Sequence, residues 1–363
     1  MSSLTLSETT PRATSSDRAI ALWLFACCAM ILLMVVIGGI TRLTESGLSI
    51  TEWQPVTGVL PPLTDAQWAA EFEKYKAIPQ YRAIHADMTL GAFKHIFFWE
   101  YLHRLWGRLI GVAFAVPFAY FLVRGRVSRH LAPRLVLLFA LGGLQGALGW
   151  YMVESGLSER IEVSQYRLAA HLAAAALIYA AILWVALDLV WLEREAVLDP
   201  RQKRLRHGIG LVLAFVALTL VAGAFVAGLR AGYIYNTFPL MGDRLVPAEY
   251  GALSPWWRNW FENAAAVQFD HRLLAEITVG EVAGLWLFSL RLHLAPRARA
   301  AINGLFTVAL LQLALGISTL LLVVPLPLAV AHQAGAMLLL TAALVAFHAL
   351  RPPRVDGARA PAL

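Results

Sequence analysis

The chain has 363 residues, of which 59% are hydrophobic and 15% are charged, whereas soluble domains carry about 25% charged residues. The mean hydropathy of +0.63 indicates a membrane protein rather than a soluble one. The net charge of +7 does not indicate nucleic-acid binding, because the basic residues lie in short runs between apolar stretches. The two cysteines, Cys27 and Cys28, are adjacent, which excludes a disulfide framework and a CxxC metal site, and we expect both to be buried.

Residues 1–18 form a polar leader in which two arginines are opposed by two acids. Because this is a poor mitochondrial transit peptide, we expect a multi-pass protein of the bacterial inner membrane. The first apolar stretch is longer than a signal-peptide core and has no cleavage site, which predicts a retained helix. A bilayer span takes about 20 apolar residues. Eight stretches have this length: Ala19–Ile40, Tyr101–Val123, Leu131–Val153, Leu168–Leu192, His207–Leu229, Arg272–Leu292, Ala300–Val324 and Leu326–Leu350.

Basic residues are distributed asymmetrically around these eight predicted spans. Links rich in arginine and lysine are typical of the cytoplasmic side of a membrane. On this side we place the links Arg124–Arg134, Glu193–Arg206 and Arg291–Arg299 and the tail after Leu350. The long segments Thr41–Trp99 and Arg230–Asp270, rich in tryptophan, lie on the outer side. Both termini are therefore predicted to be cytoplasmic.

The second half of the chain repeats landmarks of the first. The hexapeptide LQGALG at 144–149 matches LQLALG at 311–316, and His103-Arg104 matches His271-Arg272. The fold class that we predict is thus all-α integral membrane, with two tandem, pseudo-symmetric four-helix bundles related by an axis along the membrane normal. The predicted units are a disordered cytoplasmic leader (1–18), an N-terminal bundle (19–192), a cytoplasmic linker (193–206), a C-terminal bundle (207–350) and a cytoplasmic tail (351–363).

Four of the ten histidines form a pattern. His103, His171, His271 and His332 each lie near the outer start of an even-numbered predicted span, two in each half. Ionisable side chains at membrane depth usually face the bundle interior and a partner. Zinc and copper sites gather their ligands closely, often with carboxylate or thiolate, whereas two imidazoles on non-adjacent helices suit the axial ligation of a heme iron. Four other histidines are expected at the basic side, exposed to solvent or headgroups: His130, His207, His293 and His348.

Charged residues accompany two of these histidines. Glu100 lies three residues before His103, one helical turn away, and the second half has no carboxylate at the matching position. This difference suggests that the first-half site performs chemistry and the second-half site carries electrons. Arg104 and Arg272 directly follow the histidines, and both pairing with heme propionates and interfacial snorkelling remain open for them.

The chain resembles the heme A synthase family. The resemblance rests on EYLHR at 100–104, His171, His271-Arg272, His332, the outer-loop stretch GGITRLTESGLS at 38–49 and NTFPLMG at 236–242. It extends from about Ala19 to Leu350. The long first loop is similar to that of the proteobacterial and mitochondrial subtype, and the cysteine pair that some members carry in their outer loops is absent here.

This resemblance implies a reaction and a set of site residues. Family members oxidise the C8 methyl group of heme O by two successive hydroxylations, through a gem-diol that loses water, giving heme A for cytochrome oxidase. By resemblance, His103 and His171 flank the substrate heme O, and His271 and His332 ligate a resident heme b. Glu100 would stabilise positive charge or move protons at the reacting edge. The protein supplies ligation, orientation and a dry environment.

Two other functions are compatible with a helical membrane protein that carries these histidines. A bis-histidine cytochrome that only transfers electrons would not need Glu100 in one half alone, and a transporter would need broken helices and midplane polar residues. The expected partners are heme O, heme A, membrane lipid, heme O synthase and assembly factors of cytochrome oxidase. The electron donor, the oligomeric state (a homo-oligomer is left open), the histidine that dissociates in turnover and the roles of His85 and His95 are not fixed by the sequence.

Overall fold

The computed structural model describes residues 13–54, 57–157, 161–191 and 198–351. Within these ranges the fold is helical, apart from an isolated β-bridge between Met241 and Arg244. Most of the predicted leader, the predicted tail after Arg351 and the first residues of the predicted linker lie outside the described residues. The expectation of an all-helical protein is confirmed.

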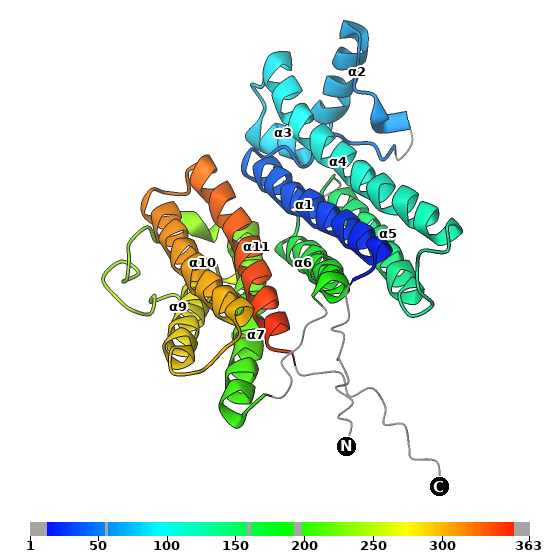
Figure 1. Ribbon diagram of the computed structural model, residues 1–363. Coiled ribbons are helices and arrows are strands. Elements are labelled where there is room, and N and C mark those ends of the chain that lie inside the picture. Colours follow the sequence, from blue (N-terminus) through cyan, green and yellow to red (C-terminus); the bar gives the residue numbers. More distant parts are fainter. Residues whose placement is uncertain (1–12, 55–56, 158–160, 192–197, 352–363) are drawn as a thin grey trace, which may run out of the picture.

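Eight long helices make up the body of the molecule (Figure 1). Seven of the described helices are long and apolar enough to cross a membrane, while α9 is equally long but carries Asp270, Arg272, Glu276 and Glu281. The eighth span therefore stays a prediction. The eight helices are α1 (Ser15–Leu43), α4 (Leu90–Val123), α5 (Ala132–Leu157), α6 (Gln165–Val190), α7 (Pro200–Gly228), α9 (Ala264–Ser289), α10 (Pro296–Leu321) and α11 (Leu326–Ala349).

Helix ends follow the local sequence. Thr14 and Asp199 each form a capping box at the start of α1 and α7, with backbone N–H groups bound by the cap side chain. Between α10 and α11, Val323 and Val324 have positive φ angles and Pro325 precedes the first helical residue. The two helices are therefore separated by a short, tight break, because proline cannot continue the preceding helix.

The long helices pack in two groups. In the first half, α1 and α5 each pack on α4 and α6, and in the second half, α7 and α10 each pack on α9 and α11. The groups meet where α6 packs on α7 and α11, and where α1 packs on α11. Figure 1 shows the first group around α1 and the second around α11. The same contact scheme thus recurs in both halves.

Buried polar contacts cross the seam between the halves. The Tyr179 and Thr341 hydroxyls are 2.7 Å apart, and Gln333 donates to the Val35 carbonyl. At one end of the seam, Asp188 of α6 binds His348 and Arg351. These contacts join α1 and α6 to α11 and to Arg351, which follows it, across a largely apolar interface.

His348 therefore departs from the sequence-based expectation. His130, His207 and His293 are exposed as expected, but only 2% of His348 is accessible. Its ring packs against Trp184 and Trp191 while Nε2 lies 3.2 Å from Asp188. The histidine is buried because two tryptophans and a carboxylate of α6 surround it.

Short elements form the opposite end of the molecule. The first outer segment holds η1 (Thr57–Val59), α2 (Asp65–Lys76) and α3 (Pro79–Ile84), which Figure 1 shows beside the start of α4. The second holds η2 (Ala231–Tyr233), η3 (Trp256–Arg258) and α8 (Asn259–Glu262). A small core of aromatic side chains, including Tyr75, Phe93 and Phe97, fixes α2 to α4.

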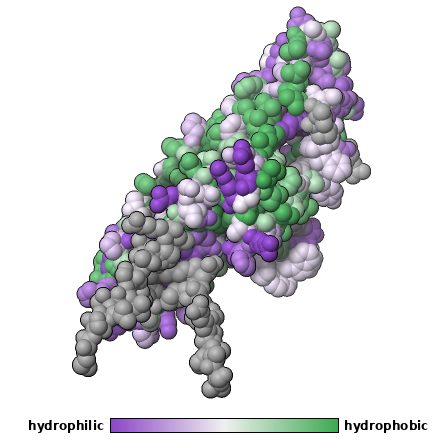
Figure 2. All heavy atoms as spheres, turned by 45° about the vertical axis from the view of Figure 1, so that its right-hand side comes forward, coloured by the Kyte–Doolittle hydropathy of each residue, from purple (hydrophilic) through white to green (hydrophobic). Residues whose placement is uncertain are grey.

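The exterior of the long helices is apolar. Large hydrophobic residues such as Leu22, Val123 and Leu144 are more than half exposed. Figure 2 shows hydrophobic residues over much of the visible face, with hydrophilic residues gathered at the end that carries α2. Such a surface is suited to lipid rather than water.

Candidate functional site

The four histidines lie inside long helices. His171, His271 and His332 occur about two turns into α6, α9 and α11, as expected. His103 differs, since α4 begins at Leu90, where Thr89 caps it, and the histidine lies more than three turns further on. All four rings are half-buried.

His271 and His332 face each other. Their ring centres are 6.3 Å apart and their planes are nearly perpendicular, at 85°. A metal held between two imidazoles needs two metal–nitrogen bonds of about 2 Å, and each ring centre lies about 1 Å behind its nitrogen. The ring centres of such a pair are therefore about 6 Å apart. The second-half pair fits axial ligation of a heme iron.

The second nitrogen of His271 points to a fixed partner. Its Nδ1 lies 3.1 Å from the backbone carbonyl oxygen of Thr219 on α7. A carbonyl can only accept, so Nδ1 carries the proton and Nε2 keeps its lone pair. Metal-binding histidines are oriented in this way. His271 thus has the tautomer that an iron ligand requires.

A glutamine side chain contacts each of the rings of His171 and His332. Gln145 Nε2 donates to the carbonyl oxygen of His171 at 2.9 Å and lies 3.1 Å from its Nδ1. Gln312 Nε2 has the same two distances to His332. An amide NH2 can only donate, so Nδ1 of these two rings is the acceptor, the reverse of the arrangement at His271. Each glutamine therefore fixes the ring in place.

Each histidine also packs against a glycine of the neighbouring helix. A Cβ atom added at Gly149, Gly223 or Gly316 would lie 2.9–3.0 Å from the ring Cε1 of His171, His271 or His332, respectively. Such distances are at or below the shortest that real Cβ atoms show, so the ring would have to shift. Glycine lets the helix backbone approach the ring closely, so these three positions set how far each imidazole reaches into its bundle.

His103 has different surroundings. The glycine beside it is Gly38 of α1, and an added Cβ there would lie 3.2 Å from Nε2 and 3.4 Å from Cδ2. No hydrogen bond to the His103 ring occurs among the described residues. Its charge would nevertheless interact with that of His171, which places the two imidazoles in one region of the first bundle.

Glu100 is completely buried and fully hydrogen-bonded. Ser49 Oγ and the Ile50 backbone N–H donate to one carboxylate oxygen at 2.8 and 2.7 Å. Arg104 donates to the other oxygen from two nitrogens, at 3.0 and 2.6 Å. Arg104 also binds the carbonyls of Ile50 and Glu52. The pair therefore fastens the first outer segment to α4.

The second half repeats this anchor with an amide. Gln268 lies 168 residues after Glu100, the offset that also relates the two arginines. Its side chain donates to the carbonyls of Ala231 and Tyr235, and it accepts from Arg272 at 3.2 Å. Arg272 further binds the carbonyls of Tyr235 and Thr237. Both arginines thus hold loop backbone in this structure.

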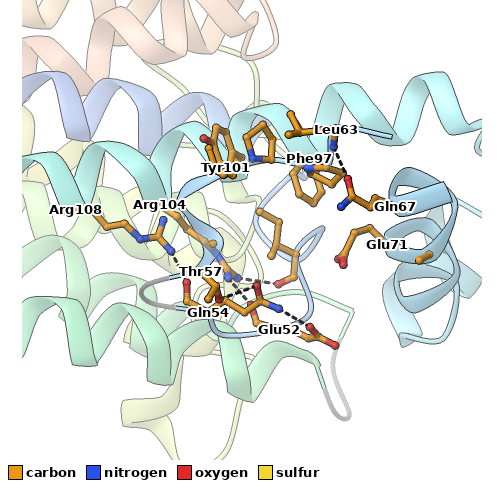
Figure 3. A pocket seen from close by; sticks show the side chains of 16 residues that line it. Glu52, Gln54, Thr57, Leu63, Gln67, Glu71, Phe97, Tyr101, Arg104 and Arg108 are labelled. Atoms are coloured by element: carbon orange, nitrogen blue, oxygen red, sulfur yellow. Dashed lines mark hydrogen bonds between the residues drawn. The ribbon is translucent and has the colours of Figure 1, made fainter. Parts of the chain in front are cut away.

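A cavity of about 360 Å³ lies between the first outer segment and α4 (Figure 3). On α4 it is lined by Phe97, Tyr101, Arg104 and Arg108, which recur at helical spacing and share one face. His103 projects from a different face of the same helix. In Figure 3 the two arginines extend toward the loop that carries Gln54. The cavity is therefore separate from the histidine pair.

His85 and His95 are not part of either histidine pair. Tyr75 binds His85 Nδ1 at 2.6 Å, and Glu45 lies 3.4 Å from the other ring nitrogen. Burial raises the pKa of Tyr75, so its hydroxyl stays protonated and can donate. His95 is exposed on α4. The first histidine therefore ties α2 to the outer end of α1.

Comparison with known proteins identifies the family. Residues 21–344 match the family model described as cytochrome oxidase assembly protein. The heme A synthase of Rhodospirillum centenum is 54% identical over 355 residues, covering 97% of this chain and 94% of that protein. Those of Nitrosospira multiformis and Bradyrhizobium diazoefficiens are 51% and 52% identical, with coverage of at least 90% of each chain. The chain belongs to the heme A synthase family.

Sequence reasoning in this heme A synthase family member located the histidines but missed their supports. Gln145, Gln312, Gly149 and Gly316 were present in the repeated hexapeptide, which was used only as evidence for the repeat. Their recurrence at the same place in both halves was the available signal. Gly38, Gly223 and the Thr219 carbonyl gave no comparable signal, because backbone contacts between helices are not encoded in a local pattern.

Proposed function

We propose that this chain is a heme A synthase, an oxidoreductase that converts the C8 methyl group of heme O into a formyl group by two hydroxylations. The proposal is carried by one observation. A chain of this family has two histidine pairs, each with a glycine beside every ring and a glutamine on the second ring. Two equivalent heme positions are what a resident cofactor and a heme substrate require.

The two halves have separate roles in this proposal. His271 and His332 hold the resident heme b, whose iron supplies one-electron redox chemistry when it is bound. His103 and His171 hold the substrate heme O, and the apolar helix faces around them accommodate its farnesyl tail. Glu100 is charged and accepts all its hydrogen bonds, whereas its counterpart Gln268 is neutral and donates two of its own, so a carboxylate near the first pair is the feature that distinguishes the substrate site.

In this proposal Glu100 acts as a negative charge whose position is fixed by hydrogen bonds. Its carboxylate is held by Ser49, Ile50 and Arg104, so it presents a negative charge at a constant place beside the first bundle. A preorganised charge of this kind stabilises positive charge that develops during oxidation. Arg104 and Arg272 shape the outer face of each heme site, and either can pair with a propionate through its remaining N–H groups.

We also propose the membrane arrangement. Eight spans, with α9 as the sixth, form two pseudo-symmetric bundles in the bacterial inner membrane, with cytoplasmic termini and heme sites toward the periplasm. Asp188 binds both Arg134 and Arg351, which brings the start of α5 to the ends of α6 and α11. This contact supports placing the link before α5 and the tail after α11 on one side, as the positive-inside rule would require. Heme O synthase and assembly factors of cytochrome oxidase are the proposed partners.

The experiment that tests the function replaces each ligand histidine with alanine. Loss of His103 or His171 is expected to abolish heme A formation while the heme b spectrum remains. Loss of His271 or His332 is expected to remove the heme b spectrum. The measurement is a pyridine hemochrome spectrum of purified protein, expressed with and without heme O synthase. If all four variants bind both hemes normally, the ligand assignment is wrong.

A further inference from the structure

We propose that the cavity beside α4 binds the headgroup of a phospholipid that carries both a phosphate and a primary ammonium group, as phosphatidylethanolamine does. The cavity has a volume of about 360 Å³, which is within the range of cavities that hold small molecules. Among the described residues that line it there is no histidine. The proposal goes beyond the heme chemistry, so the lipid site and the proposed function can hold or fail separately.

The part of the lining that α4 forms carries a positive charge. Arg104 and Arg108 lie one helical turn apart and both line the cavity. The charge of Arg104 is balanced by Glu100, whose carboxylate lies 2.6 Å away. Arg108 donates to the backbone carbonyl oxygen of Gln54 at 2.8 Å, and this oxygen belongs to a neutral group. Two guanidinium groups and one carboxylate together give this side a net charge of +1.

The part of the lining that α2 and the loop before it form carries a negative charge. Glu52 of the loop and Glu71 of α2 both line the cavity. The ammonium group of Lys74 lies 3.0 Å from Glu52 and 2.8 Å from Glu71. Its hydrogen bond lowers the pKa of Glu52, so this carboxylate is ionised at neutral pH. Two carboxylates and one ammonium group together give this side a net charge of −1.

A headgroup with both charges matches this distribution. Figure 3 shows Arg104 and Arg108 on one side of the cavity and Glu71 on the other. A simple anion would be attracted by the arginines and repelled by the carboxylates, and a simple cation would meet the reverse. A phosphate suits a guanidinium group, and a primary ammonium group has three N–H donors. Lys74 contacts Oε1 of Glu71, which leaves Oε2 to accept one of these donors.

Apolar side chains at the same cavity indicate that the zwitterion belongs to a lipid. Leu60 and Leu63 line the cavity but are 72% and 73% exposed. Exposed apolar patches of this kind mark contacts with membranes or partners. The loop that carries them is held on α4, because the Tyr101 hydroxyl donates to the Val59 carbonyl, and Tyr101 begins the predicted second span. A lipid headgroup in the cavity can therefore extend its acyl chains over both leucines, whereas a water-soluble zwitterion would leave them exposed.

The test measures the binding of single lipids to the full chain. The protein is purified in detergent, depleted of lipid and titrated with phosphatidylethanolamine, phosphatidylcholine or phosphatidylglycerol, and native mass spectrometry gives the affinity for the first lipid bound. Phosphatidylethanolamine is expected to bind about tenfold more tightly than the other two, because choline has no N–H group for Glu71 and glycerol has no positive charge. Equal affinities would overturn the proposal. Competition by glycerophosphoethanolamine, which lacks acyl chains, at the concentration of the lipid would overturn the assignment to a lipid.

Two substitutions separate the two charges of the headgroup. Glu71→Gln is expected to abolish the preference for phosphatidylethanolamine over phosphatidylcholine, while Lys74 keeps Glu52 as its partner. Glu73→Gln on the same helix is the matched control, because Glu73 pairs with Lys76 and does not line the cavity. Equal effects of these two substitutions would overturn the proposal.

Arg108→Gln tests the phosphate side of the same cavity. It is expected to weaken the binding of all three lipids by about tenfold, because each lipid carries a phosphate. Arg82→Gln is the control, since Arg82 is exposed on α3 and does not line the cavity. Circular dichroism and the thermal unfolding midpoint verify that each variant is folded. Unchanged binding by folded Arg108→Gln would overturn the proposal, whatever the heme content of the protein.

Discussion

A metal-binding imidazole is held by a hydrogen bond at its second ring nitrogen, and this bond fixes the orientation of the ring. In this chain the fixing groups are simple, namely two glutamines, one carbonyl and a set of glycines. The histidines were found from the sequence because four of them recur at equal positions. Their supports could not be found in the same way, because Gln145 and Gln312 in an apolar span are equally typical of helix–helix hydrogen bonds.

A substitution at Gly316, the glycine beside His332, tests whether close packing sets the orientation of the ring. Gly316→Ala would place a methyl group 2.9 Å from Cε1, so the ring must move or rotate. We expect the resident heme b to be retained with a shifted reduction potential and altered low-spin EPR signals, because the ligand orientation changes. Gly304→Ala, on the same helix and without neighbours within 4 Å, serves as the control. Identical potentials for the two variants would contradict this role.

The role of Glu100 can be separated from its structural contacts. Glu100→Gln keeps the side-chain volume and, like Gln268, can still accept from its arginine. We expect the thermal unfolding midpoint to fall, because the amide cannot accept from Arg104 on one side and from both Ser49 and Ile50 on the other, and we expect folded protein that still binds heme b to form little heme A because the charge is gone. Heme O content and heme b content are measured in the same sample. A variant that is as active as the wild type would remove Glu100 from the chemistry.

At the scale of elements, seven of the eight predicted spans correspond to described helices that are long and apolar enough to cross a membrane, but the start of one of them was misplaced. The second span was placed from Tyr101, whereas α4 begins at Leu90, because Lys94, His95 and Glu100 lower the hydropathy of its first turns. The start of α4 is set by the cap at Thr89 and by aromatic packing on α2, which hydropathy does not report. This extension supplies the surface to which the outer segment is fastened.

The two loop anchors are expected to differ in strength. Arg104→Leu leaves Glu100 as an unpaired buried carboxylate, which costs about 3–5 kcal/mol. Arg272→Leu leaves the neutral, equally buried Gln268, which costs about 1–3 kcal/mol. We therefore expect Arg104→Leu to lower the unfolding temperature more and to expose the first outer segment to limited proteolysis. Equal losses of stability would contradict the charge argument.

At the scale of the molecule, ionic contacts hold the halves together at both ends of the seam. On one side Arg230, just after α7, lies 2.5 Å from both Glu45 and Glu162 of the first half. On the other side Asp188 binds Arg351. The repeat in the sequence indicated two units but could not show these pairs, because each pair joins one half to the other rather than matching positions within the repeat. The covalent linker is therefore one of several connections.

This arrangement predicts that the halves assemble without a covalent link. A chain divided between residues 194 and 195 and co-expressed as two polypeptides is expected to copurify through a tag on one part, because α1 and α6 pack directly on α7 and α11. Arg230→Ala is expected to reduce copurification, since Glu45 and Glu162 lose their shared partner at the seam. Lys76→Ala removes an ion pair with Glu73 that lies wholly within the first half, so it should leave copurification unchanged. Halves that purify separately, or an equal effect of both substitutions, would show that the seam contacts do not hold the molecule together.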